Sequence, residues 1–255
     1  REPLLAGCFR VAVGRPGQND FVLKTLADSI RPDALLFDMD GVLVDVSRSY
    51  DRAVVRTVEI LAGRPAKAEE IRALRLRTGF NDDGNLTAAL LARRGLRLSR
   101  RDIMRVFEPV YFGRGGDGLI LEERALVAKD VLARLSRRCP LGIVTGRPRL
   151  EAFVTLRRLG LDGLFSTVVA RDAVAGRLKP DPYGIRLAMK RLGVRRAAYI
   201  GDIPDDMRAA RSAGAVGVAV FNGPRAERPR WEARMRRAGA RVVLDRIDDC
   251  EEALL

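Results

Sequence analysis

Two aspartates separated by one residue are the first feature of this sequence that could carry out chemistry. Asp38 and Asp40 lie in "LLFDMDGVLVD", directly after a short apolar run, and Gly41 permits a tight turn behind them. Carboxylates this close repel each other unless a proton or a cation compensates their charge. A hard divalent cation bound by oxygen ligands, most simply Mg²⁺, would do so. Alone, an Asp-x-Asp-Gly segment is equally typical of a turn or a helix cap.

Groups that could bind an anion or a cation follow at three further places. "IVTGRP" offers the Thr145 hydroxyl and the Gly146 amide at the end of an apolar run. "RLKPDP" places Lys179 on a loop just before a helix, and "YIGDIPDD" ends another apolar run with Asp202 and Asp206. Singly, a Thr-Gly pair can be only a turn, and a lone lysine is usually solvated. Together they supply donors for a phosphate, a point positive charge and further carboxylates.

These groups need a scaffold that brings them together, and the apolar pattern predicts one. Continuous apolar runs alternate with helical periodicities, which predicts a doubly wound α/β domain with a parallel sheet buried on both faces. In such sheets, sites form outside the carboxyl ends of the strands, where the polar groups above are found. The expected strands are 34–38, 141–146, 166–170, 197–202, 217–221 and 241–245.

One long interval interrupts this alternation. Residues 47–116 contain only helical periodicities, among them a helix whose start Ser99 and Asp102 would cap. The sequence therefore predicts an all-helical domain at 47–116, inserted directly after the first catalytic strand. The α/β catalytic core is expected to comprise 33–46 and 117–255, and the glycine-rich stretch 113–118 forms the return linker.

Composition and charge narrow the function classes. The chain has 255 residues, of which 47% are apolar and 31% charged, and its net charge is +14. Arginines are spread over almost every expected helix without interleaved aromatic residues, so a nucleic-acid partner is not expected. No apolar run is long enough for a membrane span and no secretory signal is present, so we expect a cytoplasmic protein without a membrane partner. A basic nucleic-acid-binding or regulatory module remains a second hypothesis, favoured only by the charge.

The segments "DMDGVLVD", "TGRP", "KPDP" and "GDIPDD", in this order and spacing, resemble the four motifs of the haloacid dehalogenase superfamily. The resemblance is to subfamily IA, whose helical cap is inserted after the first motif, and it covers about residues 33–255. It implies an HAD-like Rossmannoid core and a phosphoric monoester hydrolase. Two positions depart from the pattern or leave it open: Ile203 stands where relatives often have Ser or Thr, and Asp205 beside Asp206 leaves the identity of the last acid open.

The resemblance also implies catalytic roles. Asp38 would be the nucleophile that forms an aspartyl-phosphate, and Asp40 the general acid that protonates the leaving alcohol and later activates water. Thr145 and Gly146 would hold the phosphoryl oxygens, and Lys179 would neutralise charge beside the nucleophile. An acid two residues after the nucleophile suits phosphoester cleavage, because a leaving oxygen needs a proton.

The implied cofactor is Mg²⁺. Its ligands would be Asp38, the backbone carbonyl of Asp40 and Asp202, while Asp206 would support the Mg²⁺-bound waters or Lys179. The substrate would be a small-molecule phosphate ester.

Substrate choice in this subfamily comes from a loop between cap helices, and "RTGFNDDGN" is the best candidate here. Its polar groups would suit an amine, an imidazole or a hydroxyl-bearing substrate better than a second phosphate. The alternative is a solvent-facing turn whose acids cap a following helix at Leu86. The candidate specificity residues are Arg77, Asn81, Asp82, Asp83 and Asn85.

The first 30 residues are expected to form a strand and a helix outside the catalytic machinery. Residues 1–28, with "CFRVAVGRPGQNDFVLKTL", resemble the C-terminal end of histidinol-phosphate aminotransferases, and the chain begins with Arg1 rather than Met. We therefore expect a fusion to, or an association with, an aminotransferase. Histidinol phosphate then becomes an attractive substrate, since its dephosphorylation follows that transamination in histidine biosynthesis. A phosphoglycolate-type or sugar phosphatase is the alternative.

Overall fold

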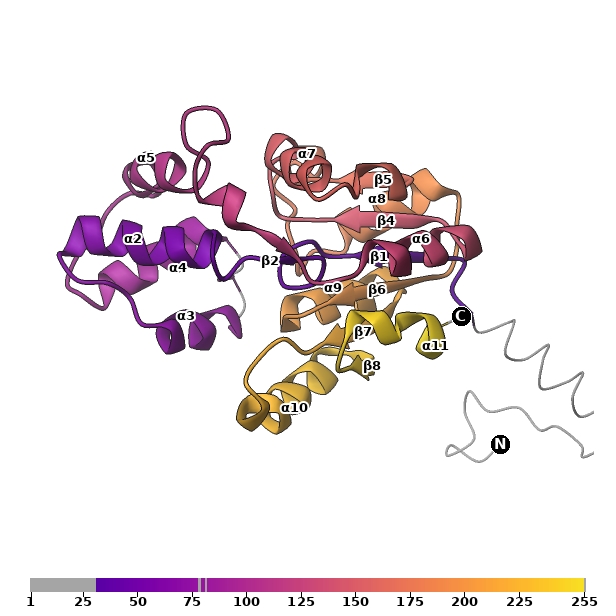
Figure 1. The fold of residues 1–255 in the computed structure, drawn as a ribbon. Coiled ribbons are helices and arrows are strands. Elements are labelled where there is room, and N and C mark those ends of the chain that lie inside the picture. Colours follow the sequence, from indigo (N-terminus) through magenta and orange to yellow (C-terminus); the bar gives the residue numbers. More distant parts are fainter. Residues whose placement is uncertain (1–30, 78, 81, 255) are drawn as a thin grey trace, which may run out of the picture. The chain divides into compact units, whose positions relative to one another are not determined.

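A six-stranded parallel sheet forms the centre of the structure (Figure 1). The computed structural model describes residues 31–254 except residues 78 and 81. The strand order is β5-β4-β1-β6-β7-β8, and every neighbouring pair is parallel. This confirms the predicted doubly wound α/β fold, and each expected apolar run overlaps one strand. The strands are β1 (Ala34–Phe37), β4 (Leu141–Val144), β5 (Thr167–Val169), β6 (Ala197–Gly201), β7 (Val216–Val220) and β8 (Ala240–Leu244).

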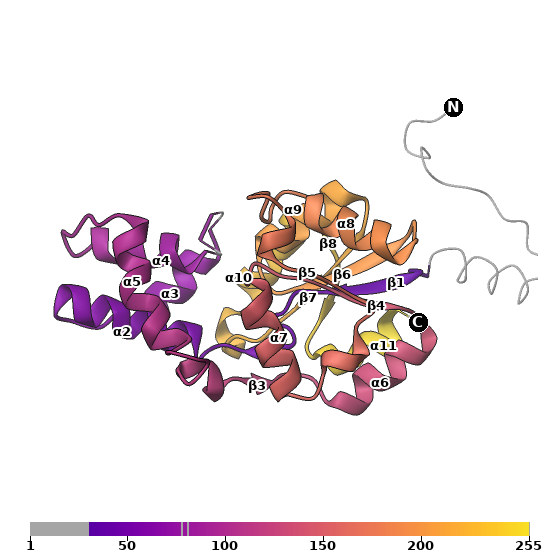
Figure 2. The same ribbon diagram turned by 90° about the horizontal axis from the view of Figure 1, so that it is seen from above.

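Helices cover both faces of this sheet (Figure 2). Leu35 and Phe37 of β1 are buried in one apolar cluster with side chains of α6, α7 and α11, whereas Leu36 is buried in another with α8 and α9. Successive strand residues point to opposite faces, so a run that is apolar throughout can fill both clusters. The helices are α6 (Lys129–Arg138), α7 (Arg149–Arg158), α8 (Tyr183–Leu192), α9 (Pro204–Ala213), α10 (Arg228–Ala238) and α11 (Cys250–Leu254). Short 3₁₀ turns lie at η2 (Leu119–Glu122), η3 (Asp162–Leu164), η4 (Arg171–Ala173), η5 (Arg225–Glu227) and η6 (Ile247–Asp249).

The described residues of the interval without strands form four helices (Figure 1). Their buried apolar side chains pack in a cluster of their own. The chain enters this helical insert after β2 (Val44–Asp45) and returns through β3 (Arg124–Ala125), and these two short strands pair antiparallel. As expected, Ser99 caps the last helix, because its hydroxyl oxygen accepts a 3.2 Å hydrogen bond from the Asp102 amide. The helices of the insert are α2 (Tyr50–Ala62), α3 (Ala68–Arg75), α4 (Asp83–Ala92) and α5 (Arg100–Tyr111).

Two further expectations concern the first 30 residues and membrane-spanning helices. The strand and helix expected within residues 1–30 lie outside the described residues. Within the described part of the chain, none of the helices combines the length and the apolar character that a membrane span requires.

The double-sided core gives a stability prediction. Ile143 of β4 is fully buried, and Ile143→Ala should lower the free energy of unfolding by about 2 to 5 kcal/mol, because neighbouring strands cannot close the cavity. Val216 of β7 is 37% exposed, so Val216→Ala should cost less than about 1 kcal/mol. Urea unfolding of both variants measures the difference, and equal losses would contradict the packing described here.

Candidate active site

Three neighbouring strands end together and deliver polar groups to one edge of the sheet. β1 pairs with β4 on one side and β6 on the other, with Phe37 opposite Ile143 and Ile200. Asp38, Thr145 and Asp202 follow directly after these strands, and therefore lie at the carboxyl edge of the sheet. The parallel register thus brings together residues more than 100 positions apart in the sequence.

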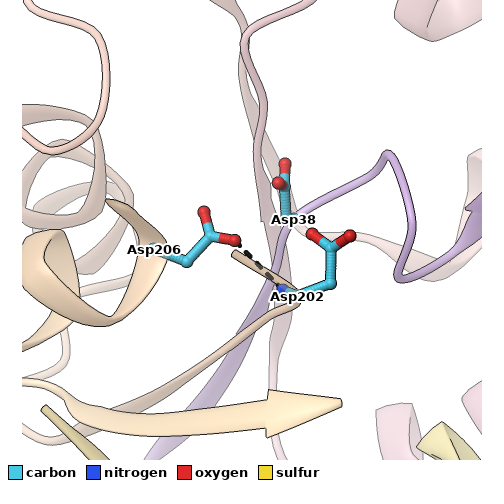
Figure 3. A group of neighbouring side chains, drawn as sticks. All are labelled: Asp38, Asp202 and Asp206. Atoms are coloured by element: carbon cyan, nitrogen blue, oxygen red, sulfur yellow. Dashed lines mark hydrogen bonds between the residues drawn. The ribbon is translucent and has the colours of Figure 1, made fainter. Parts of the chain in front are cut away.

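An acidic cluster, formed by Asp38, Asp202 and Asp206, occupies this edge (Figure 3). One carboxylate oxygen of each residue lies within 4.8 Å of the others. Three carboxylates in such proximity form an all-oxygen donor set, which fits a hard divalent cation. The carboxylate of Asp40 does not belong to this cluster, because it faces Arg147 instead.

Lys179 lies against the acidic cluster. Its Nζ atom is 2.6 Å from Asp38 Oδ2 and 2.7 Å from Asp206 Oδ1, and it donates a 3.0 Å hydrogen bond to the Tyr199 hydroxyl. Burial disfavours the charged amine, but the attraction of the two carboxylates outweighs it and raises the pKa of Lys179 well above its ordinary value. The ammonium group therefore stays charged beside the nucleophile candidate.

The carboxylates of the cluster are held in an environment that penalises their charge. Burial raises the pKa of Asp38 to about 7, with repulsion from Asp206 and Asp40 adding to the effect and Lys179 opposing it. Burial, together with Asp206 and Asp38, also raises the pKa of Asp202 well above its ordinary value. One lysine does not compensate three carboxylates, so the site favours a bound cation.

The two consecutive aspartates of α9 have different partners. Asp206 holds Lys179 and also accepts hydrogen bonds of 3.1 Å from the amides of Asp202 and Ile203. Asp205 points elsewhere, since its Oδ2 accepts a 3.2 Å hydrogen bond from the Gly79 amide in the insert. The geometry therefore associates Asp206 with the cluster and Asp205 with the insert, a distinction that the sequence left open.

Gly41 allows the chain to turn tightly beside the cluster. Its φ of +71° lies in the left-handed region, and a Cβ atom at this position would collide with the Asp202 carboxylate. The side-chain amide of Asn222 donates to the Gly41 carbonyl, and Trp231 Nε1 donates a 3.1 Å hydrogen bond to the Asp202 carbonyl. The loop after β7 and helix α10 thus help to position the turn.

Thr145 and Gly146, which the sequence suggested as phosphate-binding groups, line a cleft together with Lys179. The Thr145 amide donates to the Val169 carbonyl at 3.0 Å, and its hydroxyl oxygen accepts from the Arg147 amide at 3.1 Å. The hydroxyl proton is thereby left to donate to an anion. A Cβ atom on Gly146 would meet nothing within 4 Å, so the backbone there is open to a ligand.

The candidate specificity loop lies over a cleft between the insert and the sheet edge, but arginines already pair with its acids. Asp82 caps α4 and is 2.9 Å from Arg100 and 3.0 Å from Arg171, the latter joining insert to core. Asp83 is 2.9 Å from Arg75, and burial nevertheless raises the pKa of Asp83 to about 6. Both acids still line the cleft, so the expected helix cap and a contact with substrate are compatible.

The other loop candidates differ in position. Asn85 donates a 3.3 Å hydrogen bond to the Gly79 carbonyl and lines the cleft near Thr145. Arg77 is exposed, lies over the Phe80 ring and is not among the residues that line the cleft. Asn81 lies outside the described residues.

Arg147 and Glu151 are among the groups in the cleft that the sequence did not single out. Arg147 contacts Asp40, and only its position two residues after Thr145 could have drawn attention to it. Glu151 lines the cleft and accepts a 2.5 Å hydrogen bond from the Tyr50 hydroxyl. Burial raises the pKa of Glu151 to about 7, although Tyr50 and Arg147 oppose the shift. No sequence pattern marked Glu151, because it reads as an ordinary helix-surface acid.

Comparison with protein families gives a match to the haloacid dehalogenase-like hydrolases over residues 32–214. The match contains the site residues from Asp38 to Asp206, whereas Asn222 and Trp231 lie beyond it. It begins at residue 32, and the comparisons give no support to the resemblance of residues 1–28 to an aminotransferase.

Individual relatives share the same region. An imidazoleglycerol-phosphate dehydratase from Phytophthora nicotianae is 37% identical over 74% of this chain, which spans only 43% of that protein. A phosphorylated carbohydrates phosphatase from Thermotoga maritima is 30% identical over 71% of this chain and 82% of its own length. The solved structure of a phosphatase from Thermococcus thioreducens is 29% identical and superimposes with a TM-score of 0.60, covering 75% of this chain and 94% of its own.

The turn at Gly41 gives a prediction for metal binding. Gly41→Ala and Gly63→Ala both force a left-handed alanine, but only the first collides with Asp202, since nothing lies within 4 Å of a Cβ at Gly63. We expect Gly41→Ala to weaken Mg²⁺ binding by about 10-fold to 100-fold and Gly63→Ala to leave it unchanged. Calorimetric titration with Mg²⁺ measures this, and equal affinities in the two variants would show that Asp202 does not bind the ion.

Proposed function

The chain belongs to the haloacid dehalogenase-like hydrolases, and on that premise we propose that it is a Mg²⁺-dependent phosphatase that hydrolyses a small phosphate monoester. The single observation that carries the proposal is Lys179, held between Asp38 and Asp206 beside an all-oxygen donor set. A carboxylate can attack a phosphate dianion only where positive charge compensates both. This edge of the sheet supplies a fixed ammonium group and a place for a cation.

In the first half-reaction, Asp38 forms an aspartyl-phosphate. A carboxylate oxygen of Asp38 bonds to phosphorus while the bond from phosphorus to the ester oxygen breaks. The electron pair of the broken bond stays on the leaving oxygen, which takes the proton carried by Asp40. The Thr145 hydroxyl, the Gly146 amide and Lys179 bind the phosphoryl oxygens meanwhile.

In the second half-reaction, water restores the enzyme. Asp40, now a carboxylate, takes a proton from a water molecule whose oxygen bonds to phosphorus, and the bond between phosphorus and the Asp38 oxygen breaks. Inorganic phosphate leaves, Asp38 is again a carboxylate and Asp40 is again protonated. Mg²⁺, which Asp38, Asp202 and the Asp40 carbonyl would hold with Asp206 behind them, would compensate the negative charge of the phosphoryl group when bound.

For the substrate, we propose an ester with a cationic or imidazole group, such as histidinol phosphate. The cleft above Asp38 and Asp40 is lined by six carboxylates and only three arginines, which favours a cation beside the ester. The relative whose name includes imidazoleglycerol phosphate supports an imidazole-bearing substrate. Because this chain spans less than half of that relative, its dehydratase activity is not carried over.

A sugar phosphate is the second candidate. The Thermotoga maritima relative, a phosphatase of phosphorylated carbohydrates, matches this chain over most of its length. Hydroxyl groups could bind the same carboxylates without a positive charge. Phosphoglycolate is the weakest fit, because its own carboxylate would face the carboxylates of the cleft.

A panel of phosphate esters tests the reaction class. With Mg²⁺, the wild-type protein should release phosphate from histidinol phosphate faster than from sugar phosphates, and slowest from phosphoglycolate. Asp38→Asn removes the nucleophile and should lower kcat by at least about 10³-fold on all of them. Phosphate release by a colorimetric assay measures both, and an Asp38→Asn variant as active as wild type would rule out the aspartyl-phosphate.

The pKa of Glu151 gives a pH prediction. As pH rises through about 7, Glu151 loses its proton and the cleft gains a negative charge that attracts a cation. This charge should therefore raise the kcat/KM for phosphoethanolamine, relative to that for glycerol phosphate, about three- to fourfold between about pH 6 and about pH 8, as expected for about 1 kcal/mol of attraction. The ammonium group stays charged over this range. It also lowers the second pKa of its own phosphate, so part of the pH dependence of the ratio comes from the substrates and is the same for wild type and variant.

Glu151→Gln is the matched control for this experiment. The amide keeps the size of the side chain and can still accept a hydrogen bond from Tyr50, but it does not ionise. The ratio of the two esters should then lose the contribution of this charge and rise less with pH than in wild type. An unchanged rise in the variant would mean that another group recognises the cation.

A further inference from the structure

A buried ion pair between Arg147 and Glu123 has no role in the chemistry proposed above. Arg147 follows β4 with a side chain that is 1% exposed, and Glu123 precedes β3 with a side chain that is not exposed at all. Two hydrogen bonds join them, from Arg147 Nη1 to Glu123 Oε2 at 3.0 Å and from Nη2 to Oε1 at 2.9 Å. Burying such a pair costs solvation energy, so its presence calls for a physical explanation.

Arg147 also pairs with Asp40. Arg147 Nε donates to Asp40 Oδ1 at 2.7 Å, and Nη2 is 2.5 Å from the same oxygen. Both contacts involve Oδ1, which leaves Oδ2 available to exchange a proton. Asp40 lines the cleft with Asp38, and 31% of its side chain is exposed there. Arg147 therefore holds one oxygen of this carboxylate from behind while the group faces the cleft.

Glu123 in turn fixes the guanidinium group from the opposite side. Its carboxylate also accepts hydrogen bonds from Ser49 Oγ at 2.9 Å, Tyr111 Oη at 3.2 Å and Thr155 Oγ1 at 2.5 Å. Ser49 lies just before α2, Tyr111 ends α5, and Thr155 belongs to α7. Glu123 is thus hydrogen-bonded to the segment that enters the insert, to the last helix of the insert and to a core helix. Arg147 therefore has little freedom to move.

Two more contacts complete the enclosure of Arg147. Its Nη1 donates a 2.9 Å hydrogen bond to Thr155 Oγ1, and its guanidinium carbon lies 4.9 Å from the centre of the Tyr50 ring. A guanidinium group with a planar arrangement of donors is well suited to hold two carboxylates in fixed directions. A lysine could keep the charge at this position but not these directions.

We propose that Arg147 is a positioning residue for Asp40, and that Glu123 orients Arg147 for this task. A general acid must lie within hydrogen-bond reach of the leaving oxygen, and a free aspartate side chain divides its time among several rotamers. The inference rests on the proposed role of Asp40 as general acid and base. It assigns the ion pair a function in proton transfer that a pair with a purely structural role would not have.

The test compares two esters that depend differently on the general acid. Glycerol phosphate releases a strongly basic alkoxide and needs a proton, whereas p-nitrophenyl phosphate releases a stable phenolate that needs little help. We expect Arg147→Lys to lower kcat/KM on glycerol phosphate by about 10-fold to 100-fold, and on p-nitrophenyl phosphate by less than about threefold. Asp40→Asn should show the same selectivity, more strongly.

A double-mutant cycle shows whether Arg147 acts through Asp40. In the Asp40→Asn background, Arg147→Lys should cause no further loss on glycerol phosphate, because the group that it positions is absent. Arg94→Lys is the matched control, since Arg94 is 7% exposed and pairs with Glu70 at 2.8 Å within the insert. It should leave both esters nearly unaffected.

Equal losses on the two esters, or losses that add to those of Asp40→Asn, would overturn the proposal and leave the pair structural. Glu123→Gln gives a second test should Arg147→Lys fail to fold: the amide keeps an acceptor for Arg147, and the same selectivity for glycerol phosphate is expected. A uniform loss in Glu123→Gln would again overturn the proposal. If wild type hydrolyses neither these two esters nor any ester of the panel above with Mg²⁺, the proposed function fails as well. If wild type is active and Asp40→Asn shows the expected selectivity, a failure concerns the role of Arg147 alone.

Discussion

Repulsion among three carboxylates at one edge of the sheet is the constraint on which the rest of the site depends. Asp38, Asp202 and Asp206 lie within a few ångströms of one another in a largely buried position, where their charges are poorly solvated. Lys179 compensates part of this charge through contacts with two of them. The remaining negative charge creates a place for a cation, so the acidic cluster and the proposed chemistry have one electrostatic cause.

The helical insert is connected to this edge by a few specific contacts. Arg171 of the core pairs with Asp82, and Asp205 accepts a hydrogen bond from the Gly79 amide. Glu123 accepts hydrogen bonds from hydroxyl groups where the chain enters and leaves the insert, and its ion pair with Arg147 holds that side chain beside Asp40. The charges of the cleft are therefore shared between the two regions, and a substrate enclosed there would contact groups from both.

Much of the fold and part of the site could be predicted from local sequence. Apolar runs such as "ALLFD" indicate buried strands. Successive side chains point to opposite faces of the sheet, and both faces are covered by helices, so the side chains on either face must be apolar. A polar residue at the end of such a run, such as Asp38 or Asp202, then lies at the sheet edge as a consequence of strand geometry. The pairing of Arg147 with Glu123 could not be predicted, because 24 residues and a chain reversal separate them. The raised pKa of Glu151 could not be predicted either, since it depends on which neighbours bury the carboxyl group.

The sequence by itself therefore determined the α/β architecture, the place of the helical insert and the set of polar residues at the strand ends. These follow from side-chain periodicity and from turn residues, which are local properties of the chain. Only the tertiary structure decided that Asp206, rather than Asp205, holds Lys179, that Asp40 faces Arg147, and that arginines pair with the acids of the specificity loop. Such choices depend on which partners come within about 3 Å of each other, a distance that only the packing of remote segments sets.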